Sequence, residues 1–117
     1  MRRSLHFRAD EIERLHHAKA ILNQTLPNPP SLLNLAKQIG LNDFKLKRGF
    51  REIFGTTVLG YVQSLRLEQA KQLLIGTNLL IAQIAYQVGY ESTSHFSYLF
   101  KRQFGMTPRE YRQQKGL

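Results

Sequence analysis

The sequence predicts an all-α protein in which one helix-turn-helix unit occurs twice. Across its 117 residues, apolar side chains recur at three- and four-residue spacing, and no segment shows sustained period-two alternation of the kind that predicts a strand. The stretch 35–61, LAKQIGLNDFKLKRGFREIFGTTVLGY, is repeated at 84–111 as IAYQVGYESTSHFSYLFKRQFGMTPREY. A repeat of this length indicates two copies of one supersecondary unit. We therefore expect seven helices that form two helix-turn-helix subdomains joined by a long linker helix.

The two copies align through residues that a helix-turn-helix requires. Ala36 and Gly40 of the first copy match Ala85 and Gly89 of the second. A small alanine lets the second helix of the unit pack closely on the first, and glycine supplies the positive φ that the turn needs. Ala-x-x-x-Gly is common in helices, and only its occurrence twice in matched register indicates a repeated unit.

Most of the expected helices have a recognisable start or stop signal. Prolines at 27, 29 and 30 end the first helix, because proline lacks a donor N–H and restricts the residue before it. Ser31 suits the N-cap of the second helix, and Asn42 or Asp43 that of the third. Thr107, Pro108 and Glu110 form a capping box for the last helix. The expected helices cover about 12–26, 31–40, 43–55, 57–75, 81–88, 92–103 and a short segment from 107.

The long fourth helix is expected to join the two units. Its apolar residues form two stripes, and a helix with two apolar faces is normally packed between two bodies. One stripe holds Val58, Val62, Leu65 and Leu73, and the other holds Leu67, Ala70 and Leu74. The alternative is a central helix of one undivided bundle. We expect one domain over 1–117, with the first unit in 1–56, the linker helix in 57–76 and the second unit in 77–117.

Two boundaries around this helix are less obvious from the sequence. Gly76 is the expected left-handed residue that ends the long helix. Leu80 is apolar at the position where a polar cap would suit the fifth helix, so Thr77 or Asn78 is the expected cap.

Composition and charge exclude several classes of protein. Cysteine is absent, which excludes disulfides, thiolate metal sites and cysteine nucleophiles. Seventeen Lys and Arg against eight Asp and Glu give a formal charge of +9, which indicates a polyanionic partner. The longest apolar run, 79–82, is far below the roughly 20 residues of a membrane span. The opening Met1, Arg2 and Arg3 leads into no apolar stretch typical of a signal peptide, so we expect a cytoplasmic protein that does not bind membranes.

No motif for catalysis, a metal or a cofactor accompanies this charge. Glu13, His16 and His17 form an E-x-x-H-H run, but neighbouring histidines point about 100° apart on a helix and no further ligand cluster exists. A phosphate-binding glycine loop, G-x-S-x-G and paired carboxylates are all missing. We therefore expect neither an enzyme nor a metal, cofactor or small-molecule effector site.

In each copy, the second helix of the unit is expected to bury one face and to present the other. The side chains placed on the buried faces by a helical wheel are Leu46, Phe50, Ile53 and Phe54 in the first copy, and Phe96, Phe100 and Phe104 in the second. Those that project are Phe44, Arg48 and Arg51 and, at corresponding positions, Ser94, Tyr98 and Lys101. A protruding helix of this kind fits the major groove of DNA, which is about 12 Å wide.

Arg48 is the strongest candidate for base recognition, because a guanidinium can bond guanine bidentately. Phe44 would make apolar contact with a thymine methyl group. The other expected DNA contacts are Lys45, Lys47 and Arg51 in the first copy, Thr93, Ser94, His95, Ser97 and Tyr98 in the second, and Lys101 and Arg102 for the phosphate backbone. In the alternative interpretation, Phe44 is a core residue of a helix that starts late, and Tyr98 packs with its hydroxyl bonded to backbone.

The length of the linker helix constrains how both units meet DNA. About 18 residues span about 27 Å at 1.5 Å per residue, whereas successive major grooves on one DNA face lie about 34 Å apart. We expect a monomer whose two recognition helices enter adjacent major grooves, with the DNA bent toward the protein.

The segment IAQIAYQVGYESTSHFSYLFKRQFGMTPREYR closely resembles the signature of the AraC/XylS transcription regulators, and RLEQAKQLL before it matches that family's linker helix. The similarity covers about 31–113. It implies a DNA-binding module that regulates transcription, commonly as an activator that touches RNA polymerase. The resemblance places the family's base contacts on Phe44, Lys47 and Arg48 in the first copy, and on Thr93, Ser94 and Tyr98 in the second.

Three further features qualify the resemblance. Tyr98 stands where the second recognition helix of the family often carries arginine. EIERLHHAKAIL and KLKRGFREIFGTTVLGY are most similar to the siderophore-responsive PchR subgroup. Most members carry an effector or dimerisation domain before this one, so the chain is expected to be either a stand-alone regulator or the DNA-binding half of a longer one.

The main alternative function is a basic helical module that binds RNA or DNA without sequence preference. RNA-binding proteins usually stack bases on exposed aromatic side chains, whereas the aromatics of this chain fall mainly at expected buried positions. A membrane-surface helix would concentrate cations opposite one broad apolar face. A protein-binding module would show little dependence on salt.

Overall fold

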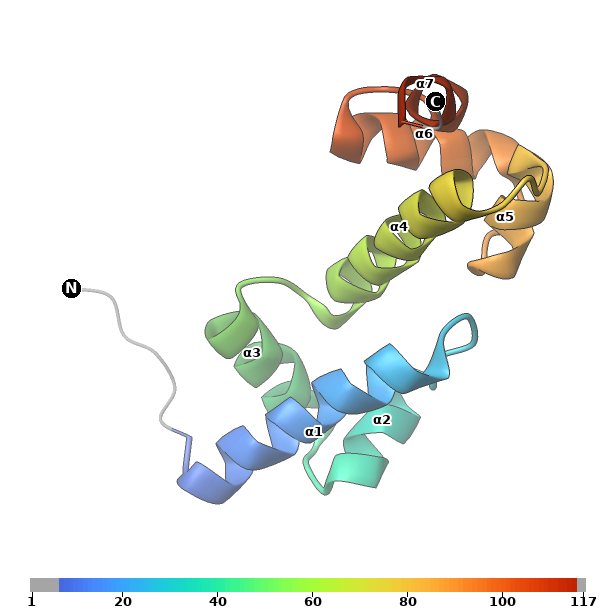
Figure 1. The fold of residues 1–117 in the computed structure, drawn as a ribbon. Helices are drawn as coiled ribbons and strands as arrows, with labels where there is room; N and C mark the ends of the chain where they lie inside the picture. The colour runs from blue at the N-terminus through green and yellow to red at the C-terminus, as the bar shows by residue number, and fades with distance from the viewer. Residues whose placement is uncertain (1–6, 116–117) are drawn as a thin grey trace. The chain divides into compact units, whose positions relative to one another are not determined.

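The computed structural model describes residues 7–115, and helices account for most of that range (Figure 1). They are α1 (Ala9–Thr25), α2 (Leu32–Ile39), α3 (Asp43–Phe54), α4 (Val58–Gly76), α5 (Ile81–Gln87), α6 (Thr93–Phe104) and α7 (Pro108–Lys115). Between residues 7 and 115 there is no strand, which confirms the all-α expectation. The basic opening at 1–3 and the last two positions of the expected 1–117 domain lie outside the described residues.

Polar side chains start most of the helices where the sequence predicts. The Ser31 hydroxyl accepts a hydrogen bond from the Asn34 amide at 3.1 Å, which caps α2. Asn42, rather than Asp43, caps α3, and its side-chain oxygen accepts from the Lys45 amide at 2.8 Å. These bonds satisfy amides that have no partner inside the helix.

The predicted capping box of the last helix is present. The Thr107 amide donates to Glu110 Oε1 at 2.9 Å, and the Glu110 amide donates to Thr107 Oγ1 at 3.1 Å. These bonds hold the pKa of the Glu110 carboxyl below its ordinary value. The ionised carboxylate at the start of α7 also interacts favourably with the helix dipole.

The predicted end of α4 is wrong. Gly76 lies inside the helix and is not one of the glycines with positive φ, which are Gly40, Gly55, Gly89 and Gly105. The last turn is closed by Thr77, whose amide and hydroxyl donate to the Leu73 carbonyl at 3.1 and 2.6 Å. The Thr77 side chain, rather than a left-handed Gly76, therefore ends the helix.

The predicted cap of α5 is also wrong. The N-cap is Leu80 itself, not Thr77 or Asn78. Its amide donates to Gln83 Oε1 at 2.8 Å. Gln83, three residues into the helix, thus satisfies the Leu80 amide, whereas the Leu80 side chain makes no capping bond to the first amides of the helix.

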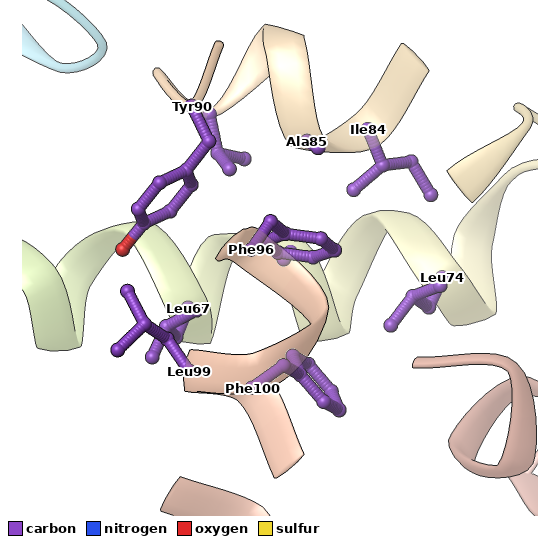
Figure 2. Packing of buried hydrophobic residues seen from close by; sticks show 10 residues of the cluster. Leu67, Leu74, Ile84, Ala85, Tyr90, Phe96, Leu99 and Phe100 are labelled. Carbon is purple, nitrogen blue, oxygen red and sulfur yellow. The ribbon is translucent and has the colours of Figure 1, made fainter. Parts of the chain in front are cut away.

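The helices form two compact units, and the boundary between Gln63 and Ser64 falls inside α4. Each unit has its own apolar core. Fully buried residues of the first include Leu15, Leu22, Leu35, Leu46 and Phe50. Those of the second include Leu67, Leu74, Ile84, Phe96 and Phe100. Figure 2 shows Phe96 of α6 pointing between α4 and α5.

The two apolar stripes of α4 divide between the units along the length of the helix. Val58 and Val62 are buried in the first unit, whereas Leu67, Ala70 and Leu74 belong to the core of the second. Leu73 was expected to lie with the valines but packs against the second core. The assignment of Leu73 to the stripe of Val58 and Val62 was wrong, because α4 belongs to the first unit up to residue 63 and to the second unit from residue 64.

The structural repeat is longer than the sequence alignment predicted. RLHHAKAIL at 14–22 and RLEQAKQLL at 66–74 share the pattern Arg-Leu-x-x-Ala-Lys-x-x-Leu. The matched residues Leu15, Ala18 and Leu22 in α1, and Leu67, Ala70 and Leu74 in α4, are all buried. The end of α4 therefore has the same role in the second unit that α1 has in the first.

Aromatic contacts repeat with the same geometry. The Phe50 ring lies 4.7 Å from Phe54 and 5.7 Å from Tyr61. Their counterparts show 4.7 Å for Phe100 to Phe104 and 5.8 Å for Phe100 to Tyr111. A lysine covers each cluster, since Lys19 Nζ lies 4.6 Å from the Phe54 centroid and Lys71 Nζ 4.5 Å from that of Phe104. Cation–π contacts of this kind stabilise the aromatic corner of each unit.

Candidate nucleic-acid interface

α3 is held against α1 by a close helix approach. Its buried residues are Leu46, Gly49 and Phe50. A Cβ atom at Gly49 would lie only 2.5 Å from Leu15 Cδ1, so glycine permits this packing. Ile53 and Phe54 were expected on the buried face but are only partly buried.

The opposite face of α3 is open to solvent and cationic. Phe44 is 58% exposed, so the alternative that places it in the core is wrong. Lys47, Arg48 and Arg51 are exposed on the same helix. Arg48 Nε lies 3.8 Å from Glu52 Oε2, a loose contact that leaves the guanidinium available to a ligand.

Lys45 is engaged within the protein. Its ammonium lies 2.6 Å from Glu11 Oε2, and the Glu11 side chain is only 3% exposed. The other Glu11 oxygen accepts from the Arg8 amide at 3.0 Å. The sequence prediction assigned Lys45 to DNA and did not foresee this ion pair. The available signal was that Glu11 lies four residues before the buried Leu15 and therefore on the same face of α1.

The bond from Lys45 lowers the pKa of Glu11 below its ordinary value of 4.5, the Arg8 amide lowers it further, and burial opposes both. A depressed pKa means that the folded state favours the carboxylate, so this contribution to stability is present at neutral pH and is lost as pH falls through the folded-state pKa. The pair therefore braces the start of α3 against the start of α1.

Glu11→Gln is expected to lower the thermal unfolding midpoint at pH 7, because Lys45 loses its charged partner. The difference from the unmodified chain should shrink as the pH is lowered through 4.5 and below, since protonated Glu11 no longer attracts Lys45. Circular dichroism melts of both proteins between pH 7 and 3 measure this. Glu13→Gln, which neutralises an exposed carboxylate on the same helix that makes no ion pair with Lys45, is the control. A gap of constant size across this range would contradict the assigned role of the ion pair.

α6 presents a different chemistry at the corresponding positions. Ser92 caps the helix by accepting from the His95 amide at 3.1 Å. Tyr98 is 61% exposed, so the alternative in which it packs into the protein is wrong. The other predicted contacts on this helix are exposed, apart from the partly buried Ser97; they are Thr93, Ser94, His95, Lys101 and Arg102. The face of α6 thus offers hydroxyl and imidazole groups first and cations toward its end.

A buried tyrosine fixes the turn that precedes α6. Tyr90 is 7% exposed, and its ring is covered by the Arg66 guanidinium at 5.5 Å. The ring also contacts His95 edge-on, with centroids 5.9 Å apart. Burial raises the pKa of the Tyr90 hydroxyl, and the charge of Arg66 opposes that shift. The tyrosine therefore remains neutral and ties the first turn of α6 to α4.

Within residues 7–115, no three His, Asp or Glu side chains gather closely enough to hold a metal ion. Over the same range, no helix has both the length and the apolar character needed to cross a lipid bilayer.

Comparison with known proteins identifies the arrangement. The family model described as a helix-turn-helix domain matches residues 35–114. A solved transcriptional regulator with an AraC-type DNA-binding domain, from Chromobacterium violaceum, superposes with a TM-score of 0.84 and 33% identity, covering 92% of this chain and 96% of that one. The chain belongs to the AraC-type family of helix-turn-helix DNA-binding domains. A further similar structure is the DNA-binding domain of the global transcriptional factor AdpA in complex with a target DNA, with a TM-score of 0.80 and 25% identity, covering 86% of this chain and 91% of that one.

Curated relatives of the AraC-type chain are longer regulators. The regulatory protein PchR of Pseudomonas aeruginosa is 47% identical over 64 residues, which is 55% of this chain and 22% of PchR. The transcriptional activator RhaR of Cronobacter sakazakii is 37% identical over 106 residues, or 91% of this chain and 38% of RhaR. The AraC-type domain thus spans well under half the length of these relatives.

Proposed function

We propose that this AraC-type chain binds double-stranded DNA at a specific sequence and thereby regulates transcription, with α3 and α6 as its two recognition helices. The observation that carries the proposal is the matched exposure of Arg48 on α3 and Tyr98 on α6, on the faces opposite to Phe50 and Phe100 of the two cores. Base edges in the major groove present a distinct donor and acceptor pattern for every base pair.

α3 is the stronger of the two recognition helices. Arg48 supplies bidentate bonds to guanine, and Lys47 and Arg51 supply base or phosphate contacts. Lys45 contributes through its bond to Glu11 rather than through DNA, because its ammonium is already paired at 2.6 Å. The sequence-specific part of the affinity is therefore assigned mainly to the first unit.

α6 contributes adaptable contacts and backbone charge. Thr93, Ser94, Ser97, His95 and Tyr98 offer hydroxyl and imidazole groups, which discriminate bases less sharply than a guanidinium does. Lys101 and Arg102, near the end of the helix, are assigned to phosphates. The second half-site is accordingly expected to be less constrained in sequence than the first.

We further propose that the chain acts in the cytoplasm as a monomer, with no small-molecule effector bound to it. It occupies two half-sites about one helical turn apart on DNA that bends toward the protein. RhaR is named as a transcriptional activator, which supports activation, and we propose that this chain activates through contact with RNA polymerase. The alternative remains a basic module that binds nucleic acid without sequence preference.

Selection of bound duplexes from a random pool tests the function directly. Two enriched motifs about 10 base pairs apart, and a bend in electrophoretic phasing of the selected duplex, would support the proposal. Competition at one salt concentration should favour the selected duplex over random duplex, RNA and anionic vesicles. A pool that shows no enrichment would favour the non-specific alternative.

Arg102→Ala is expected to weaken binding to selected and random duplexes by similar factors. The plot of log affinity against log salt should lose about one unit of slope, because one phosphate contact is removed. Titrations at several salt concentrations measure this. Lys115→Ala, which removes an exposed cation at the end of α7 outside the proposed contacts, is the control and should leave the slope unchanged. A loss confined to the selected duplex would show that Arg102 reads bases instead.

A further inference from the structure

The first unit carries a hollow of about 560 Å³ beside the outward face of α3. It is lined by residues from the start of α2, from α3 and from the first turn of α4, namely Leu32, Phe44, Lys47, Arg48, Arg51, Thr57, Val58 and Leu59. Four of the expected DNA contacts therefore lie around one concave surface, namely Phe44, Lys47, Arg48 and Arg51. Leu59 did not enter the sequence prediction.

The lining combines apolar carbon with positive charge. Leu32 and Val58 are partly or fully buried, whereas Phe44 and Leu59 are 58% and 68% exposed. The charged groups around them are all cationic. Phe44 and Leu59 are thus exposed to water next to cationic side chains. Such a surface suits a partner that is negatively charged and also carries an apolar group.

We propose that this hollow receives the 5-methyl group of one thymine in the DNA site, with Leu59 as a second apolar contact beside Phe44. The inference rests on the proposed DNA binding and adds a specificity-determining residue to it. Thymine is the one base whose major-groove edge carries an apolar group, next to an O4 acceptor that a cation can bond. The other bases would place a polar edge against leucine and phenylalanine, which leaves that edge without a hydrogen bond.

The position of Leu59 is fixed before DNA arrives. Thr57 Oγ1 accepts a hydrogen bond from the Gly60 amide at 2.9 Å, which closes the first turn of α4 around Leu59. The Val58 side chain beside it is only 5% exposed and is part of the first core. Because this turn is already ordered, little conformational freedom is lost when Leu59 meets a base.

The second unit lacks the same apolar surface. By the register of the repeat, Phe44 corresponds to Ser94 and Leu59 corresponds to Arg109. Both counterparts are polar and exposed. The methyl preference should therefore be confined to the half-site that α3 reads.

The test uses the whole chain and a duplex chosen by selection from a random pool. Each thymine of that duplex is replaced in turn by deoxyuridine, which removes only the 5-methyl group. With the unmodified chain, one position in the half-site read by α3 should lose about fourfold in affinity, the effect of leaving one methyl group unburied. With Leu59→Ala, affinity for the unmodified duplex should fall by a similar factor, and deoxyuridine at that position should cause little further loss.

Leu33→Ala is the matched control, because Leu33 is 59% exposed on α2 and does not line the hollow. It should keep both the affinity and the fourfold deoxyuridine effect. Since Leu59 is exposed, its alanine variant should fold normally, as a thermal melt will verify.

An undiminished deoxyuridine effect in Leu59→Ala, or no methyl-sensitive thymine in the half-site read by α3, would overturn the inference while leaving the proposed function intact. If the unmodified chain enriches no sequence from the pool, the proposed function itself fails.

Discussion

Arg48→Ala is expected to cost about 1 to 3 kcal/mol in binding to the selected duplex, the usual value of one bidentate contact to guanine. Binding to random duplex should change far less, because only a general positive charge is lost there. The pool selected by the variant should also lose its preference at one base pair. Affinity measurements on both duplexes, together with a repeated selection, measure these effects.

Arg48→Lys separates recognition from charge. Lysine keeps the cation but lacks the planar pair of donors, so it should retain binding to random duplex and lose most of the preference. The variants should be as stable as the unmodified chain, because Arg48 is exposed and its 3.8 Å contact with Glu52 is a surface ion pair. Equal losses on selected and random duplexes would assign Arg48 to phosphate instead of base.

Phe100→Ala is expected to destabilise the second unit by about 3 to 5 kcal/mol. The ring is fully buried and contacts Phe96, Phe104 and Tyr111 with centroid distances of 5.8, 4.7 and 5.8 Å. Removing it leaves a cavity and ends all three aromatic contacts. A loss of this size is a large part of the stability of a small domain, so urea unfolding should begin at much lower concentration.

The effect should be local, because each unit has its own core. Amide hydrogen exchange in Phe100→Ala should accelerate in α5, α6 and α7, whereas α2 and α3 keep more of their protection. Phe50→Ala, the equivalent change in the first unit, should show the reverse pattern. Uniform acceleration over both units in either variant would mean that the two cores unfold as one.

Much of the fold follows from local signals that act within a few residues. Ser31, Asn42 and the Thr107–Glu110 box lie where their side chains can reach the free amides, and the positive φ values of Gly40 and Gly89 follow from the turn. The prediction that a left-handed Gly76 ends α4 was wrong, because the threonine at the next position closes the last turn through its side chain. A local rule that allows two solutions does not say which one the chain uses.

The less predictable features depend on contacts between distant residues. Glu11 and Lys45 are 34 positions apart, so their charges alone do not reveal that the pair is buried. The hollow that includes Leu59 forms only once the first turn of α4 lies beside α3. The motif shared by 14–22 and 66–74 was present in the sequence, and it would have extended the repeat to α1.

The duplication leaves the buried cores of the two units alike and their exposed helix faces different. The two copies keep nearly identical aromatic geometry within, while their outward helices carry arginine in one case and tyrosine in the other. With α3 and α6 reading DNA as we propose, substitutions on one recognition helix should change the base preference at one half-site without destabilising either core. The sequence preferences of the two proposed half-sites should therefore be able to diverge in separate steps.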